Sequence, residues 1–209
     1  MQALARALAD PALKAQVCAV ISNRPDASGL QWAREQGLET VALDHKAYAS
    51  REQFDAALGD AIASFEPDYV LLAGFMRVLT DAFVQRFAGR VINIHPSLLP
   101  AFPGMHTHRK ALEMGVAWHG CSVHFVTPVL DHGPIIAQAA VPVEPDDDEH
   151  TLAQRVLQAE HYVYAQVVRW LAQSRVALDA QGKVTLTGKP ARAFWLAANE
   201  GRIAPGESI

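Results

Sequence analysis

The sequence has few cysteines, no excess of charge and no long hydrophobic run, and each absence excludes a class of protein. Cys18 and Cys121 are the only cysteines, and both lie in apolar segments, so we expect buried thiols instead of a disulfide or a reactive nucleophile. Charged residues make up 19% of the chain and the net charge is −4, which argues against binding to nucleic acid or an anionic membrane. The longest apolar run, Tyr69–Met76, is far below the roughly 20 residues of a membrane span.

The N-terminus also lacks the basic segment and apolar stretch of a secretory signal, so the sequence predicts a cytoplasmic protein. Hydrophobic residues make up 50% of the 209 residues, which is enough for a substantial core. We therefore expect one domain over residues 1–209.

Short apolar segments alternate with amphipathic segments along the chain, as in proteins whose helices cover a parallel sheet. Strands are predicted at residues 17–21, 39–43, 69–75, 91–94, 122–126 and 135–143. Helices are predicted at residues 29–36, 81–87 and 152–172, and after the capping box at residues 50–53. The predicted fold class is α/β, with a Rossmann-like, open, mostly parallel sheet and flanking helices. The continuous apolar strand 69–75 is expected to be covered on both faces.

The two ends of the chain and one acidic run carry further expectations. Residues 1–8 are helical in pattern with no strand before them, although an α/β sheet normally begins with a strand, so we expect the first strand to be missing from this chain. Residues 175–178 and 183–186 flank a turn and predict a C-terminal hairpin, followed by a tail that ends at residue 209. The acidic run Asp146–Glu149 is expected to be a solvated helix start.

Two polar side chains end one of the buried strands. Asn93 and His95 lie two residues apart, so both point to the same face of the sheet, and Pro96 keeps His95 extended. Ligands of open α/β sheets bind at the carboxyl ends of the strands. An amide beside an imidazole suits the stabilisation of an oxyanion and the movement of a proton during acyl transfer. A purely structural pair at a strand end has the same spacing.

A third candidate is Asp131, on the loop that follows the strand at residues 122–126. A carboxylate near His95 would favour the imidazolium and fix its orientation. An aspartate in such a loop is most often a turn residue, so this position alone does not decide its role.

Several ordered motifs resemble one known family. They are NIHPSLLP at residues 93–100, FPGMHT at 102–107, HGCSVHFV at 119–126 and LDHGP at 130–134. Together they closely resemble the phosphoribosylglycinamide formyltransferases, which transfer the formyl group of 10-formyltetrahydrofolate to the amine of glycinamide ribonucleotide in purine synthesis. The resemblance extends from Met1 to about Trp170.

The resemblance implies roles for named residues. Asn93 and protonated His95 would hold the tetrahedral oxyanion, while Asp131 would organise His95 and a proton-carrying water. Glu160 would contact the glycinamide ribonucleotide. The positions that resemble the folate-binding residues are Arg51, Met76, Arg77, Val78, Leu79, Asn93, Thr127, Pro128, Val129, Leu130 and Asp131.

The resemblance further implies that 10-formyltetrahydrofolate is the co-substrate, that no metal is needed, and that both partners are small molecules. The chain would be a monomer or a homodimer. In the family, a Gly-Ser-Asn loop after the first strand cradles the substrate phosphate, and Met1 aligns with the helix just after that loop. His132 stands where the family usually has glycine, a change that we expect the exposed loop to tolerate.

Three alternatives stay open. Related formyl-folate enzymes carry an extra regulatory domain or a basic tRNA-binding domain, and neither fits 209 residues with a net charge of −4. The chain could also be an N-terminally truncated protein that binds folate without turnover. A metal-dependent hydrolase would draw on six histidines, but no His-Glu-x-x-His motif or paired-cysteine spacing is present. These histidines are His95, His106, His108, His119, His124 and His132.

Overall fold

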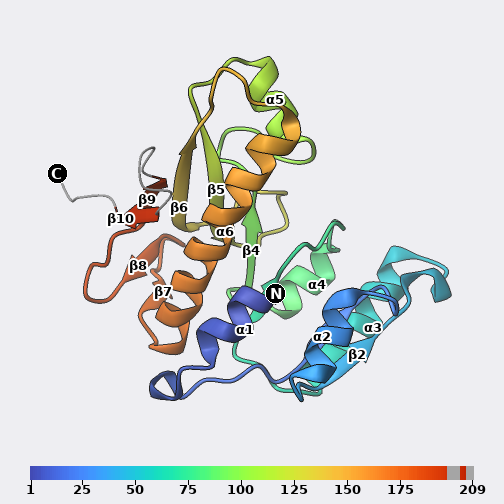
Figure 1. The fold of residues 1–209 in the computed structure, drawn as a ribbon. Coiled ribbons are helices and arrows are strands. Elements are labelled where there is room, and N and C mark those ends of the chain that lie inside the picture. Colours follow the sequence, from blue (N-terminus) through green and yellow to red (C-terminus); the bar gives the residue numbers. More distant parts are fainter. Residues whose placement is uncertain (197–202, 206–209) are drawn as a thin grey trace.

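The computed structural model describes residues 1–196 and 203–205 and confirms the α/β fold class (Figure 1). Within these residues, six strands form the main sheet in the order β10-β9-β6-β5-β4-β3. Their bounds are β3 (Val70–Leu72), β4 (Val91–His95), β5 (Trp118–Phe125), β6 (Ile135–Pro142), β9 (Ala193–Leu196) and β10 (Ile203–Pro205). Two further sheets each hold two strands: β1 (Val20–Ser22) with β2 (Thr40–Ala42), and β7 (Val176–Leu178) with β8 (Val184–Leu186).

The longest helix, α6 (Glu149–Ala172), lies across the main sheet and packs on β5 and β6 (Figure 1). The helix α1 (Gln2–Leu8) packs on α6, whereas α2 and α3 lie with β1 and β2 in a lobe beside the main sheet. The other helices are α2 (Ser28–Glu35), α3 (Arg51–Ala63), α4 (Asp81–Arg86) and α5 (Thr107–Glu113), with single 3₁₀ turns at Pro11–Leu13 and His45–Ala47. No helix in the described part of the chain is long and apolar enough to cross a membrane.

The helix α6 begins where its sequence provides a cap. The Asp148 side chain accepts a hydrogen bond from the Thr151 N–H at 2.8 Å, and the Thr151 hydroxyl accepts one from the Asp148 N–H at 3.0 Å. Asp147 differs from the expected solvated run, because its carboxylate pairs with Arg155 at 2.8 Å and its side chain is buried. This contact holds the pKa of Asp147 at about 2. Asp147, one member of the acidic run, is therefore a buried partner of Arg155 and not a solvated residue.

Strand direction changes within the main sheet. The pairs β3–β4 and β6–β9 are parallel, as is β1–β2, whereas β4–β5, β5–β6 and β9–β10 are antiparallel. The antiparallel register places Asn93 opposite His124 and His95 opposite Ser122. The side chains of these four residues therefore share one face of the sheet.

The C-terminal region contains more sheet than the sequence predicts. The hairpin is confirmed, because β7 and β8 pair in antiparallel register. Residues 193–196 and 203–205 of the predicted tail are strands that extend the main sheet beyond β6. The tail positions 197–202 and 206–209 lie outside the described residues.

Two expectations about burial are wrong. Cys121 is buried as predicted, but Cys18 is exposed, because the segment before β1 is not part of a sheet. The segment 69–75 forms only the short strand β3, whose residues are half-buried, because β3 is an edge strand of the main sheet. An apolar run can belong to an edge strand as well as to a central one.

The helix α3 anchors the loop that follows β3. Ser50 caps the N-terminus of this helix, since its hydroxyl accepts a hydrogen bond from the Gln53 N–H at 3.2 Å. The capping box is incomplete, because the Gln53 side chain accepts from the N–H of Ala49 instead of Ser50. One turn on, the buried carboxylate of Asp55 accepts the Thr80 N–H at 2.6 Å. This contact fixes the end of the loop that runs from β3 to α4.

Replacing Asp55 with alanine should destabilise the protein, because the buried Thr80 N–H would lose its acceptor, the Asp55 carboxylate. We expect a loss of about 1–3 kcal/mol, measured by chemical denaturation. Asp60→Ala is the matched control, because this carboxylate on the same helix is 75% exposed and pairs with Arg86 at the surface. Its loss should stay below about 1 kcal/mol, and equal losses for the two variants would contradict the anchoring role of Asp55.

Candidate active site

The strand β4 and its neighbour β5 hold the first polar pair. The Asn93 amide nitrogen lies 3.4 Å from Nε2 of His124. Nδ1 of His124 lies 2.8 Å from the Phe125 carbonyl, which can only accept, so Nδ1 carries the proton and Nε2 is the acceptor. Burial lowers the pKa of His124, which favours this neutral form. His124 therefore fixes the orientation of the Asn93 amide.

The loop between β5 and β6 folds back and brings Asp131 to His95. Oδ2 of Asp131 lies 3.4 Å from Nδ1 of His95 and accepts the Gly104 N–H at 2.8 Å. The side chains of His95 and Asp131 are only 8% and 7% exposed. Asp131 has a φ of 53°, and the nearby Gly133 packs so closely that an added Cβ would lie 1.6 Å from the Phe125 carbonyl oxygen. The return of the loop thus depends on a glycine and on a left-handed aspartate.

His95 also contacts the loop that follows β4. Its Nε2 donates to the Phe102 carbonyl at 2.9 Å, while Nδ1 faces the Asp131 carboxylate. Both ring nitrogens thus face acceptors, an arrangement that suits an imidazolium donating from both sides. Phe102 itself has a φ of 53°, so this carbonyl is presented by a left-handed residue.

Apolar side chains project from the two loops beside this polar group. One loop follows β3 and the other follows β5, the two neighbours of β4 in the sheet. Their exposed apolar residues are Met76, Val78, Val129 and Leu130. Such a concentration of exposed large apolar side chains at a polar site is typical of a surface for a flat organic ligand.

The remaining predicted folate positions lie in the same two loops or on α3. Arg77 stacks over the ring of Phe54 at 4.9 Å, and its Nε is buried with no protein partner among the described residues. Leu79 is half-buried and packs against the second apolar core cluster, which contains Phe54. The Thr127 hydroxyl donates to the Val129 carbonyl at 3.1 Å, which shapes the loop around the exposed Pro128. Arg51 is largely exposed at the start of α3, with Glu52 at 3.7 Å.

Glu160 lies on α6, away from the contacts that join Asn93, His95 and Asp131. Burial raises the pKa of its carboxyl to about 7, and the Met1 ammonium opposes this shift. The structure thus joins three predicted residues in one cluster and leaves Glu160 and Arg51 outside it.

The histidines do not assemble a metal centre. Among the described residues, no group of three or more His, Cys, Asp or Glu side chains could hold a metal ion. His108 and His119 form a pair with 3.2 Å between Nδ1 and Nε2. Burial lowers the pKa of both, to about 4 for His119, so the two rings are neutral near pH 7.

Three groups in the cluster were not predicted as site residues: the His124 ring, the Phe102 carbonyl and the Gly104 N–H. His124 has a signal in the sequence, since it is a histidine between the apolar residues Val123 and Phe125 of a predicted strand. The two backbone groups have none, because their positions depend on the path of the loop.

Comparisons with known proteins identify the family. Residues 1–168 match the formyl transferase family. The chain is 49% identical over 178 residues to phosphoribosylglycinamide formyltransferase from Escherichia coli, a match that covers 85% of this chain and 84% of that protein. The structure of phosphoribosylglycinamide formyltransferase from Coxiella burnetii, in complex with CHES, has a TM-score of 0.84 and 42% identity, covering 92% of each chain.

A second solved structure supports the same assignment. Glycinamide ribonucleotide transformylase 1 from Symbiobacterium toebii has a TM-score of 0.83 and 43% identity, covering 88% of this chain and 87% of that one. Similarity at this level extends over both the sequence and the fold. The chain therefore belongs to the formyl transferase family, and within it to the phosphoribosylglycinamide formyltransferases.

Proposed function

We propose that this protein transfers the formyl group of 10-formyltetrahydrofolate to the amine of glycinamide ribonucleotide, in purine biosynthesis in the cytoplasm. The observation that carries the proposal is the convergence of an amide, an imidazole and a carboxylate. Asn93 and His95 share one face of β4, and the Asp131 carboxylate lies 3.4 Å from the His95 ring. These groups can stabilise an oxyanion and move a proton, the two tasks that assist acyl transfer to an amine.

In the proposed reaction, the substrate amine attacks the formyl carbon and the carbonyl oxygen becomes an oxyanion. Asn93 and the imidazolium of His95 donate hydrogen bonds to this oxygen. Collapse of the intermediate re-forms the carbonyl and breaks the bond between the formyl carbon and N10 of the folate. The proton lost by the amine passes to N10 through a water held by Asp131, so the products are the formylated amide and tetrahydrofolate.

For this step, His95 exchanges one hydrogen-bond acceptor for another. Its Nε2–H now donates to the Phe102 carbonyl at 2.9 Å. In the reaction the oxyanion takes the place of that carbonyl, while Asp131 keeps its contact with Nδ1. Hydrogen bonds of catalytic groups often rearrange in this way when the substrate binds.

The folate would bind along the two apolar loops. Met76, Val78, Val129 and Leu130 offer exposed apolar surface for a flat pterin, while backbone groups of these loops offer polar contacts. The residues proposed to line this site are Arg51, Met76, Arg77, Val78, Leu79, Asn93, Thr127, Pro128, Val129, Leu130 and Asp131. Glu160 is proposed to contact glycinamide ribonucleotide, with no metal in the reaction.

Replacing His95 with alanine should lower kcat by at least about a hundredfold, the usual scale for a proton-transfer group. The assay is formyl transfer measured by the absorbance change of the folate. His150→Ala is the matched control, because this exposed histidine on α6 lies outside the cluster and its ring contacts Gln154. Near wild-type kcat in His95→Ala, with an intact fold by circular dichroism, would remove His95 from the mechanism.

A folate-binding protein without turnover is the second reading, and binding must be measured separately from transfer. Met76→Asp should weaken the binding of a folate analogue about tenfold, because a charge would replace apolar contact with the pterin. Met114→Asp is a close control, since Met76 and Met114 are 72% and 71% exposed and Met114 lies at the end of α5. Calorimetric titration gives both affinities. Equal losses would exclude the proposed folate surface, and analogue binding without any formyl transfer would favour the second reading.

Glu160→Gln should stabilise the protein at high pH and have little effect at low pH. The folded-state pKa of about 7 exceeds the ordinary value of 4.5, so ionising the buried carboxylate costs stability as the pH rises from 4.5 to 7. The glutamine avoids this cost, and we expect a gain of about 3 kcal/mol at about pH 8. Chemical denaturation at both pH values measures it, with the exposed Glu113→Gln as control. A gain that does not depend on pH would contradict the assignment of the shift to burial.

A further inference from the structure

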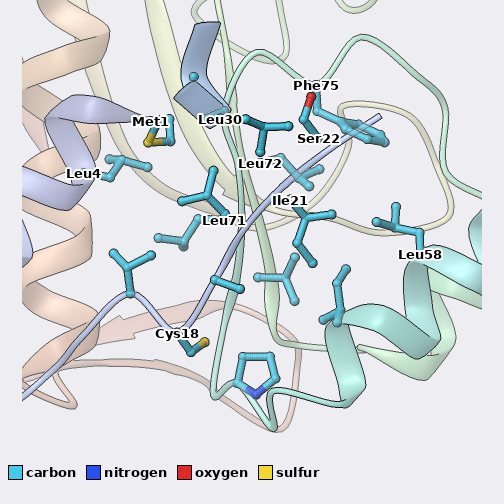
Figure 2. Close-up of a pocket in the computed structure, with 18 of the residues that line it drawn as sticks. Met1, Leu4, Cys18, Ile21, Ser22, Leu30, Leu58, Leu71, Leu72 and Phe75 are labelled. Carbon is cyan, nitrogen blue, oxygen red and sulfur yellow. The ribbon is translucent and has the colours of Figure 1, made fainter. Parts of the chain in front are cut away.

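The two edges of the main sheet differ in what borders them. At one edge, β3 borders an apolar cavity of about 450 Å³, which Ile21 of β1 and Leu71 of β3 both line (Figure 2). At the other edge, β9 and β10 extend the sheet beyond β6 (Figure 1). A charged side chain, Arg192, lies just before β9 and reaches across to β6. This second edge leads from the C-terminal segment toward the candidate site.

Arg192 joins the start of β9 to the start of β6. Its Nε donates to the Ile136 carbonyl at 2.8 Å, and its Nη2 donates to the Ile135 carbonyl. Its own carbonyl accepts the Gln138 N–H at 2.9 Å. Because β9 begins at Ala193, opposite Gln138, the strand itself does not reach Ile135 and Ile136. The guanidinium therefore supplies the donors that a longer strand would provide, and its charge strengthens both hydrogen bonds.

The first residues of β6 close the loop that carries Asp131, since Ile135 follows Asp131 by only four positions. On the side of β5, the Pro134 carbonyl accepts the Phe125 N–H at 3.0 Å. On the opposite side, the guanidinium of Arg192 holds the next two carbonyls along the chain. The end of the loop is therefore held on both sides of β6.

The start of β6 also lies against a second group of the candidate site. Ile135 pairs with His124 across β5 and β6. Nε2 of His124 lies 3.4 Å from the Asn93 amide nitrogen, and Gly133 is so near the ring that an added Cβ would lie 3.3 Å from Nδ1. A shift at the start of β6 would therefore reach the Asn93 amide as well as the Asp131 carboxylate.

We propose that Arg192 is a positioning residue for formyl transfer, which fixes the start of β6 and thereby holds the loop that brings Asp131 to His95. This inference deepens the proposed function and rests on it. Arg192 lies beyond residues 1–168, the part of the chain that matches the formyl transferase family. The C-terminal segment thus adds a support to a site whose reacting groups all belong to the matched region.

Arg192→Ala removes both side-chain donors. The loop carries Asp131 and also the residues proposed to contact the folate, so we expect kcat to fall about tenfold and KM for 10-formyltetrahydrofolate to rise about threefold. KM for glycinamide ribonucleotide should stay unchanged, since Glu160 lies on α6 and outside the loop. A role in stability alone would lower the amount of active enzyme and leave both KM values as they are.

Arg192→Lys and Arg175→Ala are the matched comparisons. Lysine keeps a charged donor for one carbonyl but loses the fork that spans two, so its kcat should lie between those of the alanine variant and the unaltered protein. Arg175 makes the same kind of contact elsewhere in the C-terminal region, because its Nε donates to the Thr187 carbonyl at 2.9 Å beside the β7–β8 hairpin. Arg175→Ala should therefore leave kcat and both KM values unchanged.

A measurement without substrate tests the hold on the loop itself. The Gly104 N–H donates to the Asp131 carboxylate at 2.8 Å, so its hydrogen exchange reports whether the loop is in place. In Arg192→Ala this amide should exchange at least about fivefold faster. The Thr80 N–H, which Asp55 accepts outside this loop, is the internal control and should be unchanged. If Arg192→Ala does not fold, Arg192→Lys takes its place in both measurements, with smaller changes in the same direction.

Four outcomes would overturn the proposal. They are unchanged kcat and KM in Arg192→Ala, a lower kcat with both KM values unchanged, equal changes in Arg175→Ala, and an unchanged exchange rate at Gly104. Formyl transfer by the unaltered protein together with any of these outcomes would overturn the role of Arg192 alone. A lack of transfer by the unaltered protein would overturn the proposed function and, with it, this role.

Discussion

The antiparallel register between β4 and β5 is the constraint on which the site depends. It sets His124 opposite Asn93 and Ser122 opposite His95. Because side chains alternate between the faces of a sheet, a slip by one residue would turn the partners away from Asn93 and His95 together. The loop that follows β5 then folds back toward β4. It brings the Asp131 carboxylate to 3.4 Å from Nδ1 of His95. One backbone alignment thus determines the relative positions of three chemical groups.

The loop after β4 is held by the buried hydroxyl of Ser122, whose hydrogen-bond partners all belong to the protein. The Ser122 hydroxyl donates to the Ser97 carbonyl at 2.7 Å and accepts from the Leu99 N–H at 2.9 Å and from Gln138 at 2.8 Å. Leaving one such group unpaired costs about 1–3 kcal/mol, so these contacts strongly favour a single path for the loop. Ser122 lies opposite His95 in the register of β4 and β5. Ser122 supports the loop and His95 lies under it, so this one cross-strand pair links the loop to the candidate site.

The sequence was sufficient to place Asn93 and His95 on one face, because alternation along an extended strand requires no tertiary information. The approach of Asp131 could not be predicted in this way, because it depends on the left-handed turn at Asp131 and the close packing of Gly133. The expectation that Asp131 acts on His95 came instead from the resemblance to a known family. The short strands β9 and β10 were missed, because a few apolar residues in a C-terminal tail do not specify whether they pair. The exposure of Cys18 was missed because a neighbouring strand, not the local sequence, decides burial at a sheet edge.

The strand β3 connects the main sheet with one of the two loops that carry exposed apolar side chains. It pairs with β4, and the Tyr164 hydroxyl of α6 lies between the two strands, where its single O–H is shared between the Leu72 carbonyl at 3.1 Å and the Ile92 carbonyl at 3.0 Å. After β3, residues 73–75 continue directly into residues 76–79, the segment proposed to receive the folate. Asn93 and His95 are thus positioned by β4 and its pairing with β5, whereas the proposed folate surface depends on a loop whose end is fixed by the contact of Asp55 with Thr80.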